Sequence, residues 1–306
     1  MLNEIERFLL HEVADLTDIP AGAYNIRANS KSAGRQSTEN VDIRPKEGVS
    51  GLDIFVKPST KGETIHIPVV MTESGLKEKV YNDFFIGDNA EVVIVAGCGI
   101  DNCGAHDSQH DGIHRFYIGK NSSVKYVEKH FGSGSGQGKR ILNPVTEVYM
   151  EENSSCEMEM VQIKGVDDTA RGTVAELKAG ASLVVRERLM THEKQNAVSE
   201  YTVSLNGEDS SADIVSRGVA RGESFQRLDL KIVGNAACKG HTECDSIIMD
   251  SGRILAVPAL EANCVDASLV HEAAIGKIAG EQLIKLMTLG LTEAQAEEEI
   301  INGFLR

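Results

Sequence analysis

The sequence predicts a mainly β protein in which a β-solenoid lies between two short helical ends. Three observations lead to this fold class. Between about residues 26 and 260, short runs rich in Val, Ile and Thr are separated by Gly, Asn, Asp and Ser, a composition typical of strands and turns. Within that region one turn pattern recurs at a nearly constant interval, and helical periodicity is confined to the chain ends. The predicted division is an N-terminal helical segment (1–25), a β core (26–262) and a C-terminal helical region (263–306).

An amphipathic helix is predicted over about the first 15 residues. Its apolar side chains recur at spacings of three and four, and acidic side chains fall between them. The apolar positions are Leu2, Ile5, Phe8, Leu9 and Val13.

Strands are predicted through the β core, for example over 91–96 and 182–187. Six apolar anchors each precede a small turn and the start of a strand: Ile86, Ile118, Met150, Leu177, Leu205 and Val233. They lie 32, 32, 27, 28 and 28 residues apart. Units of this length bury an apolar face only against neighbouring units, so the regular spacing favours a solenoid over a β-sandwich with turns aligned by chance.

Two helices are predicted in the C-terminal region. The first spans 272–289 and ends at Gly290, a residue suited to a helix C-cap. Thr292 opens the second helix, with Gln295 three residues later forming a capping box, and that helix ends near Gly303.

The composition excludes several classes of function. Acidic residues outnumber basic ones by 46 to 31, a net charge of −15, which disfavours nucleic acid and anionic membrane surfaces as partners. No apolar run is long enough to span a membrane, and the first residues lack the pattern of a secretion signal. The six Cys residues are therefore expected to be reduced thiols in a cytoplasmic protein.

The Cys and His residues fall into two groups of candidate ligands, because thiolate and imidazole bind soft and borderline metals. The first group is Cys98, Cys103, His106, His110 and His114. The second is Cys238, His241, Cys244, Cys264 and His271, with Glu272 next to the last. The spacing of the first group matches no zinc module, and Cys238, His241 and Cys244 could bind one metal only if their segment turns. A polar loop and a buried structural Cys244 stay open as alternatives, and Cys103, Cys156, Cys238 and Cys264 are left without a role.

Two parts of the sequence resemble known motifs but do not match them. The stretch 132–140 is rich in Gly but lacks the residues and the strand-to-helix context of a phosphate-binding loop, so a flexible loop is expected there. The His-Glu pairs at 11, 192 and 271 lack the second His of a zinc protease.

The C-terminal part of the sequence resembles the SufB/SufD family, the core scaffold proteins of the SUF iron–sulfur cluster assembly system. The resemblance is carried by Glu243-Cys244-Asp245-Ser246, by His271-Glu272-Ala273, and by the elements from Ile275-Gly276-Lys277 to Ile301-Asn302-Gly303-Phe304. Upstream, Gly97-Cys98 followed by Ile113-His114 is similar to a second segment of the family. The chain looks like a short SufB-like member.

This resemblance implies a fold, a function and a set of site residues. The fold is a right-handed parallel β-helix, and the function is that of a non-catalytic scaffold that assembles a transient cluster, 4Fe-4S or 2Fe-2S, and passes it on. Carried over by position, Cys244, His271 and Glu272 are ligands of the nascent cluster and Cys98 accepts sulfur. The implied partners are a SufC-like ABC ATPase docked on the C-terminal helices, a second copy of the chain, a cysteine desulfurase or other sulfur donor, and apo iron–sulfur proteins.

The chain also departs from the family pattern. It is shorter than a typical SufB, and Lys129, Phe131 and Glu147 stand where the family has the relay residues beyond its sulfur-accepting Cys. The group at His106 and His110 has no counterpart in the family. Two alternative functions stay open: a β-helix enzyme acting on polysaccharide, which calls for a secretion signal and exposed aromatics, and a SufD-like adaptor without its own cluster site.

Overall fold

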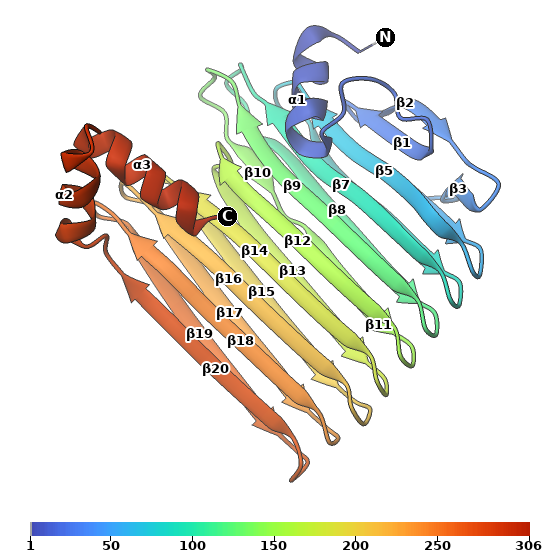
Figure 1. Ribbon diagram of the computed structural model, residues 1–306. Helices are drawn as coiled ribbons and strands as arrows, with labels where there is room; N and C mark the ends of the chain where they lie inside the picture. The colour runs from blue at the N-terminus through green and yellow to red at the C-terminus, as the bar shows by residue number, and fades with distance from the viewer. Residues whose placement is uncertain (1) are drawn as a thin grey trace.

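The computed structural model describes residues 2–306 as a β-solenoid of about eight coils with helices at both ends (Figure 1). Two sheets face each other, and each coil contributes to both. Sheet A contains, in spatial order, β2 (Lys31–Gln36), β1 (Ala23–Ala28), β5 (Lys61–Met71), β7 (Glu91–Asp101), β9 (Ser123–Ser133), β12 (Ser155–Lys164), β14 (Ser182–Thr191), β16 (Ser211–Ala220), β18 (Lys239–Ile248) and β20 (Ser268–Gly276). Sheet B contains β19 (Arg253–Ala262), β17 (Phe225–Gly234), β15 (Asn196–Leu205), β13 (Asp168–Leu177), the consecutive β10 (Arg140–Leu142) and β11 (Val145–Met150), then β8 (Ser108–Ile118), β6 (Lys77–Ile86), β4 (Gly51–Val56) and β3 (Val41–Pro45). The predicted fold class is confirmed.

The turn repeat seen in the sequence corresponds to a row of stacked residues. Five of the six anchors pair in order along sheet B: Ile86, Ile118, Met150, Leu177 and Leu205. The sixth, Val233, is one residue out of register, because Gly234 pairs with Leu205.

The turns after these anchors require a left-handed backbone. Asn89, Asn121 and Asn153 have φ values of 59°, 55° and 58°, and Gly180 has 65°. Asn and Gly adopt this conformation at the least cost, which explains their recurrence in the sequence. The Asn121 side chain also donates a hydrogen bond to Asn89 Oδ1 at 3.3 Å, so neighbouring turns are linked.

The interior of the solenoid is divided along the strands. One half lies next to the turns that follow the six anchors, at the lower right in Figure 1. Apolar side chains fill this half and form one cluster from Ala23 to Cys244. The other half lies where strands of sheet A end and strands of sheet B begin, and it contains buried polar and charged side chains such as Glu128, Arg171 and Glu187. Buried charges require partners, and this polar half contains the candidate site.

The N-terminal helix α1 (Glu4–Ala14) covers the outer face of sheet A and contacts β5, β7 and β9. Asn3 and Glu6 form a capping box at its start, and Leu9, Leu10 and Val13 are buried against the sheet. The predicted N-terminal helix is confirmed.

The C-terminal region corrects one prediction. Residues 268–276 form β20, which pairs with β18, so the helix predicted from residue 272 begins only at Gly280. Strand pairing on the exposed edge of sheet A overrides the helical spacing of residues 272–279. Helix α2 (Gly280–Thr288) is followed by Gly290 at φ 98°, and α3 (Glu293–Phe304) begins with the predicted capping box of Thr292 and Gln295. Within residues 2–306, none of the helices is long and apolar enough to cross a bilayer.

Candidate functional site

Two of the cysteines lie in neighbouring rows on the inner face of sheet A. One row consists of Cys98, His130, Gln162, Leu189, Gly218 and Ser246. The adjacent row consists of Ala96, Glu128, Met160, Glu187, Ser216 and Cys244. Five strand steps lead from β7 to β18, which at a strand spacing of about 4.8 Å separates the two thiols by about 24 Å.

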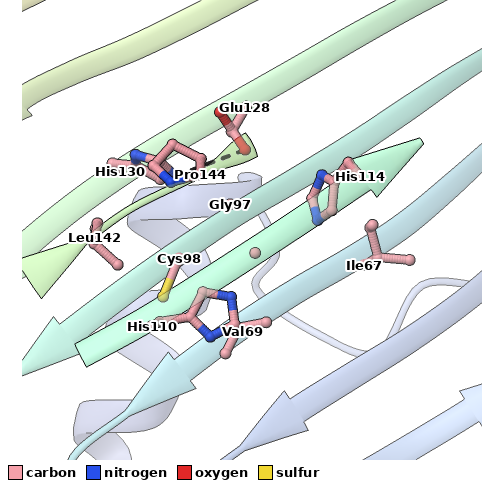
Figure 2. Close-up of a pocket in the computed structure, with 11 residues that line it drawn as sticks. Ile67, Val69, Gly97, Cys98, His110, His114, Glu128, His130, Leu142 and Pro144 are labelled. Atoms are coloured by element: carbon pink, nitrogen blue, oxygen red, sulfur yellow. Dashed lines mark ion pairs between the residues drawn. The ribbon is translucent and has the colours of Figure 1, made fainter. Parts of the chain in front are cut away.

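Cys98 lines a small cavity in the polar half of the interior. The cavity has a volume of about 10 Å³, which is at the lower limit for one water molecule. His110 and His114 on β8 reach it from sheet B, and Glu128 and His130 on β9 reach it from sheet A (Figure 2). Three members of the first predicted group, Cys98, His110 and His114, are therefore brought together.

Helix α1 explains why Cys98 lies between two glycines. Gly97 and Gly99 point to the outer face of β7, against α1. A Cβ on Gly97 would lie 2.6 Å from the carbonyl oxygens of Val13 and Lys129, and one on Gly99 would lie 3.1 Å from Leu9. Only residues without a side chain let α1 approach this closely, and the helix then covers the strand that carries Cys98.

A chain of hydrogen bonds begins at His114. Tyr126 donates its hydroxyl proton to Glu128 Oε1 at 2.9 Å, and His114 Nδ1 lies 2.7 Å from the same hydroxyl oxygen. Because that hydroxyl has one proton, the imidazole Nδ1–H is the donor to Tyr126. Nε2 is then the acceptor for the Asn82 amide at 3.3 Å, which assigns the tautomer of this histidine.

Arg171 joins two buried carboxylates in the middle of the solenoid. Its guanidinium forms a short hydrogen-bonded ion pair with Glu128 and lies 3.6 Å from Glu187. Glu187 also accepts hydrogen bonds from Ser199 at 2.7 Å and from Ser216 at 2.7 Å. The three charged side chains are 3–4% exposed, so the pairing compensates for the cost of their burial.

Burial shifts the pKa values of the site residues. For His114 and His130, burial is the largest cause and the charge of Glu128 opposes it, so that the pKa of each falls to about 4 and both are neutral at pH 7. Burial, together with the charges of Glu78 and Glu128, raises the pKa of the Cys98 thiol well above its usual value. Burial would also raise the pKa of Glu128, but Arg171 and the histidines outweigh it, so this pKa is lowered and the carboxylate is ionised.

A second ion pair closes the N-terminal end of the polar interior. His110 Nδ1 lies 3.0 Å from Glu78 Oε1, and Arg27 Nε donates to the other carboxylate oxygen at 2.8 Å. Burial opposes ionisation of Glu78, but its contacts with His110 and Arg27 prevail and lower its pKa to about 2.

Cys244 lies at the other end of the polar interior from Cys98, on β18 in the row that contains Glu187. Its side chain points inward and is 1% exposed. Burial is the largest cause that raises its pKa to about 12, and the charge of Glu187 adds to it. The thiol is therefore protonated at neutral pH.

The two other residues implied as cluster ligands lie on opposite faces of β20. His271 is on the inner face like Cys244, and its Nδ1 lies 2.7 Å from Thr242 Oγ1. Glu272 is on the outer face, where it pairs in register with Glu243. The structure thus brings Cys244 and His271 to one face in neighbouring strands and places Glu272 on the other.

Cys103 and His106 do not join Cys98. Both are exposed in the connection between β7 and β8, and Cys103 Sγ donates to Asp101 at 3.3 Å. The three residues that stand at the family's relay positions also lie outside the polar interior. Lys129 bonds to Asp15 at 2.5 Å, Phe131 packs on Phe8 of α1, and Glu147 accepts from Arg115 at 2.9 Å.

The other thiols have distinct surroundings. All six cysteines are free. Cys156 is buried in the apolar half, Cys238 is buried at a turn, and Cys264 is partly exposed. The stretch 132–140 runs from the end of β9 to the start of β10 and forms no strand-to-helix unit.

Glu128, His130, Arg171 and Glu187 were not predicted from the sequence. They lack a motif, but the signal was present in the alternation of the strands: Glu128 and His130 have the same parity as the inward-facing Tyr126. Charged residues at inward positions of several strands indicate a polar interior.

Comparison with known proteins adds evidence on ancestry. Residues 84–304 match the family model described as SUF system FeS cluster assembly, SufBD core domain. An iron–sulfur cluster assembly SufBD family protein of Pyrococcus horikoshii is 30% identical over 92% of this chain and 86% of its own length. The relative from Archaeoglobus fulgidus is 29% identical over 85% of this chain and 69% of its own length. The relative from Methanothermobacter thermautotrophicus is 27% identical over 88% of this chain, which spans only 65% of that relative.

Proposed function

The chain belongs to the SufBD family of iron–sulfur cluster assembly proteins, and on that premise we propose that it is a scaffold subunit on which a nascent cluster is built and then transferred. In this role the chain itself is not an enzyme. The observation that carries the proposal is the placement of Cys98 and Cys244 in adjacent inner rows of one sheet, at the two ends of a polar, hydrogen-bonded interior.

Cys98 is proposed to accept sulfur. Its thiol is 2% exposed beside the small cavity, so delivery from a cysteine desulfurase or another sulfur donor requires local opening of the first coils or of α1. The separation of about 24 Å between the thiols is too long for direct transfer. The row through His130 and the adjacent row through Glu128 and Glu187 line the polar interior between Cys98 and Cys244.

Cys244 is proposed as the cluster ligand, with His271 beside it on the inner face. Thiolate is the preferred ligand of iron in clusters, and imidazole or carboxylate is a weaker one that permits release to apo proteins. Glu272 lies on the outer face of β20. Because β20 is the edge strand, its carboxylate can approach a cluster at Cys244 only around that edge.

Reconstitution tests the ligand assignment. The protein is incubated anaerobically with iron and sulfide, and the visible absorbance of the cluster is recorded. Cys244→Ala is expected to lose this absorbance because the thiolate ligand is removed. Cys156→Ala, another buried cysteine of sheet A in the apolar half, is expected to keep it. A wild-type spectrum from Cys244→Ala would refute the assignment, and the lack of cluster absorbance in the wild-type protein would favour a SufD-like adaptor.

A SufC-like ABC ATPase is the proposed partner of the C-terminal helices. Helix α2 has no buried residue in the structure, and its apolar side chains Ile284, Met287 and the following Leu289 are 62%, 43% and 81% exposed. A partner that covers this face would remove that apolar surface from water. Ile284→Glu is expected to abolish co-purification with the ATPase. Ile19→Glu is expected to have no effect, because Ile19 is similarly exposed (63%) but lies between α1 and β1, and these elements are at the opposite end of the solenoid from α2 (Figure 1). Retention of the ATPase by Ile284→Glu would exclude this docking face.

Two further parts of the proposal concern assembly and location. The last coil leaves one edge of β19 and of β20 without a strand partner in the described chain, and a second copy is proposed to pair there. Six unpaired thiols suit a reducing compartment, so the cytoplasm is the proposed location.

A further inference from the structure

A group of potential metal ligands lies on the outer face of sheet A, on the side of β18 opposite to Cys244. It consists of His241 and Glu243 on β18 and Glu272 on β20. One ligand atom from each of these residues lies within 4.8 Å of the others, and within residues 2–306 no other group of three or more His, Cys, Asp or Glu side chains meets that distance. The ligand set is one imidazole and two carboxylates.

The imidazole is held in the orientation that a metal ligand needs. His241 Nδ1 lies 2.8 Å from Asp213 Oδ1, and the other oxygen of Asp213 is held by Arg186 at 2.8 Å. This leaves Nε2 of His241 directed toward Glu272, at 3.9 Å. A carboxylate behind a histidine fixes the tautomer and the direction of the free nitrogen, as in the outer shell of many metal sites.

The two carboxylates are placed where strand pairing alone would disfavour them. Glu243 and Glu272 are direct partners in the parallel pair of β18 and β20, and like charges opposite each other destabilise a sheet. A divalent cation between them would convert this repulsion into attraction. His241 and Glu243 line a groove of about 510 Å³, and the Glu272 side chain is 67% exposed, so an ion can enter from solvent.

We propose that His241, Glu243 and Glu272 bind one divalent first-row metal ion, and that Fe²⁺ held there is the iron supply for Cys244. Nitrogen and oxygen ligands suit a ferrous ion before sulfur is present. Cys244 follows Glu243 in the same strand with its side chain on the inner face, so the ion has only to pass around the edge strand to reach the thiol. The iron-supply role rests on the scaffold function proposed above, whereas the metal site does not.

Anaerobic titration of the full-length protein with Co²⁺, without sulfide, tests the site. One Co²⁺ per chain is expected to bind with visible ligand-field bands and without the near-ultraviolet charge-transfer band of a thiolate ligand. Asp213→Asn is expected to weaken binding by about 10- to 100-fold, and His241→Gln at least as much. His11→Gln removes another exposed histidine that lies 3.6 Å from a glutamate, and should leave binding unchanged. Unaltered circular dichroism would show that the variants are folded.

The Cys244→Ala variant separates the two proposals. It should bind Co²⁺ like wild type while failing in cluster reconstitution. Loss of Co²⁺ binding in Cys244→Ala, a thiolate charge-transfer band in wild type, or full binding by His241→Gln would each overturn the outer-face site. With the site present, cluster formation in His241→Gln should be slower at limiting Fe²⁺ and restored at excess Fe²⁺; equal rates at limiting Fe²⁺ would overturn the supply role alone.

Discussion

At the scale of single residues, the protein places neutral histidines beside buried charges. His114 and His130 lie next to Glu128 and Arg171, and burial rather than charge controls their protonation. The sequence located Cys98, His110 and His114, because they are close in the chain. It could not separate them from Cys103 and His106, which lie in the connection between β7 and β8, because the ends of the two strands decide which side chains enter the interior.

The lowered histidine pKa values predict loss of stability in acid. In the unfolded chain each histidine titrates near pH 6.5, whereas in the folded protein His114 and His130 titrate at about 4. Between these values the unfolded state binds more protons, so stability falls as the pH decreases from 6.5 to 4, by roughly 1 kcal/mol per pH unit for each histidine. Urea unfolding measured from pH 7 to pH 4.5 should show this slope.

In His130→Gln the unfolding free energy should depend less steeply on pH between pH 6 and pH 5, because unfolding of the variant takes up about one proton fewer. His106→Gln, at an exposed loop position, should leave the slope as in wild type. An unchanged slope in His130→Gln would show that this histidine does not resist protonation in the folded state.

At the scale of elements, the repeats were readable because their turns need left-handed residues at fixed positions, as Asn89 and Asn121 show. The start of α2 could not be predicted from the sequence. Residues 272–276 have apolar spacing compatible with a helix. In the folded protein they instead form backbone hydrogen bonds with the edge of β18, and this edge exists only once the sheet has assembled. Glu272 was likewise assigned a role without knowledge of its face, because the face follows from strand register.

The packing of α1 predicts a specific effect of a single methyl group. Gly97→Ala places a Cβ 2.6 Å from two backbone oxygens and should cost about 1–3 kcal/mol of unfolding free energy or displace α1. Gly172→Ala is the matched control, since a Cβ there meets nothing within 4 Å. Urea midpoints and the rate of limited proteolysis between residues 15 and 22 measure both effects. Equal behaviour of the two variants would mean that α1 does not pack against Gly97 as described.

At the scale of the whole molecule, the two ends of the solenoid differ. The first coils are covered by α1 and by the antiparallel strands β2 and β3, whereas the last coil exposes the apolar side chains Leu255, Val257, Leu260 and Val270. Unpaired strand edges with apolar side chains favour pairing with another chain. This difference between the ends supports the proposed homodimer.

Light scattering on purified protein tests the dimer. Wild type should have twice the chain mass of 33.1 kDa, and Val257→Lys, on the last coil, should shift the protein toward the monomer because it places a charge in the contact. Val174→Lys changes a valine of similar exposure, 44% against 41%, in the middle of the same sheet and should stay dimeric. A wild-type monomer, or a dimer unaffected by Val257→Lys, would rule out pairing through this end.

The regular stacking of coils turns the solenoid into a molecular ruler between Cys98 and Cys244. Both thiols occupy inner positions of the same sheet, and each intervening coil adds one strand spacing of about 4.8 Å between them. Removal or insertion of a whole coil in the middle would change the separation by one such step and would leave the surroundings of either thiol intact. The distance between Cys98 and Cys244 can therefore change only in steps of one strand spacing. The chain can gain or lose whole coils while the residues around each thiol stay the same.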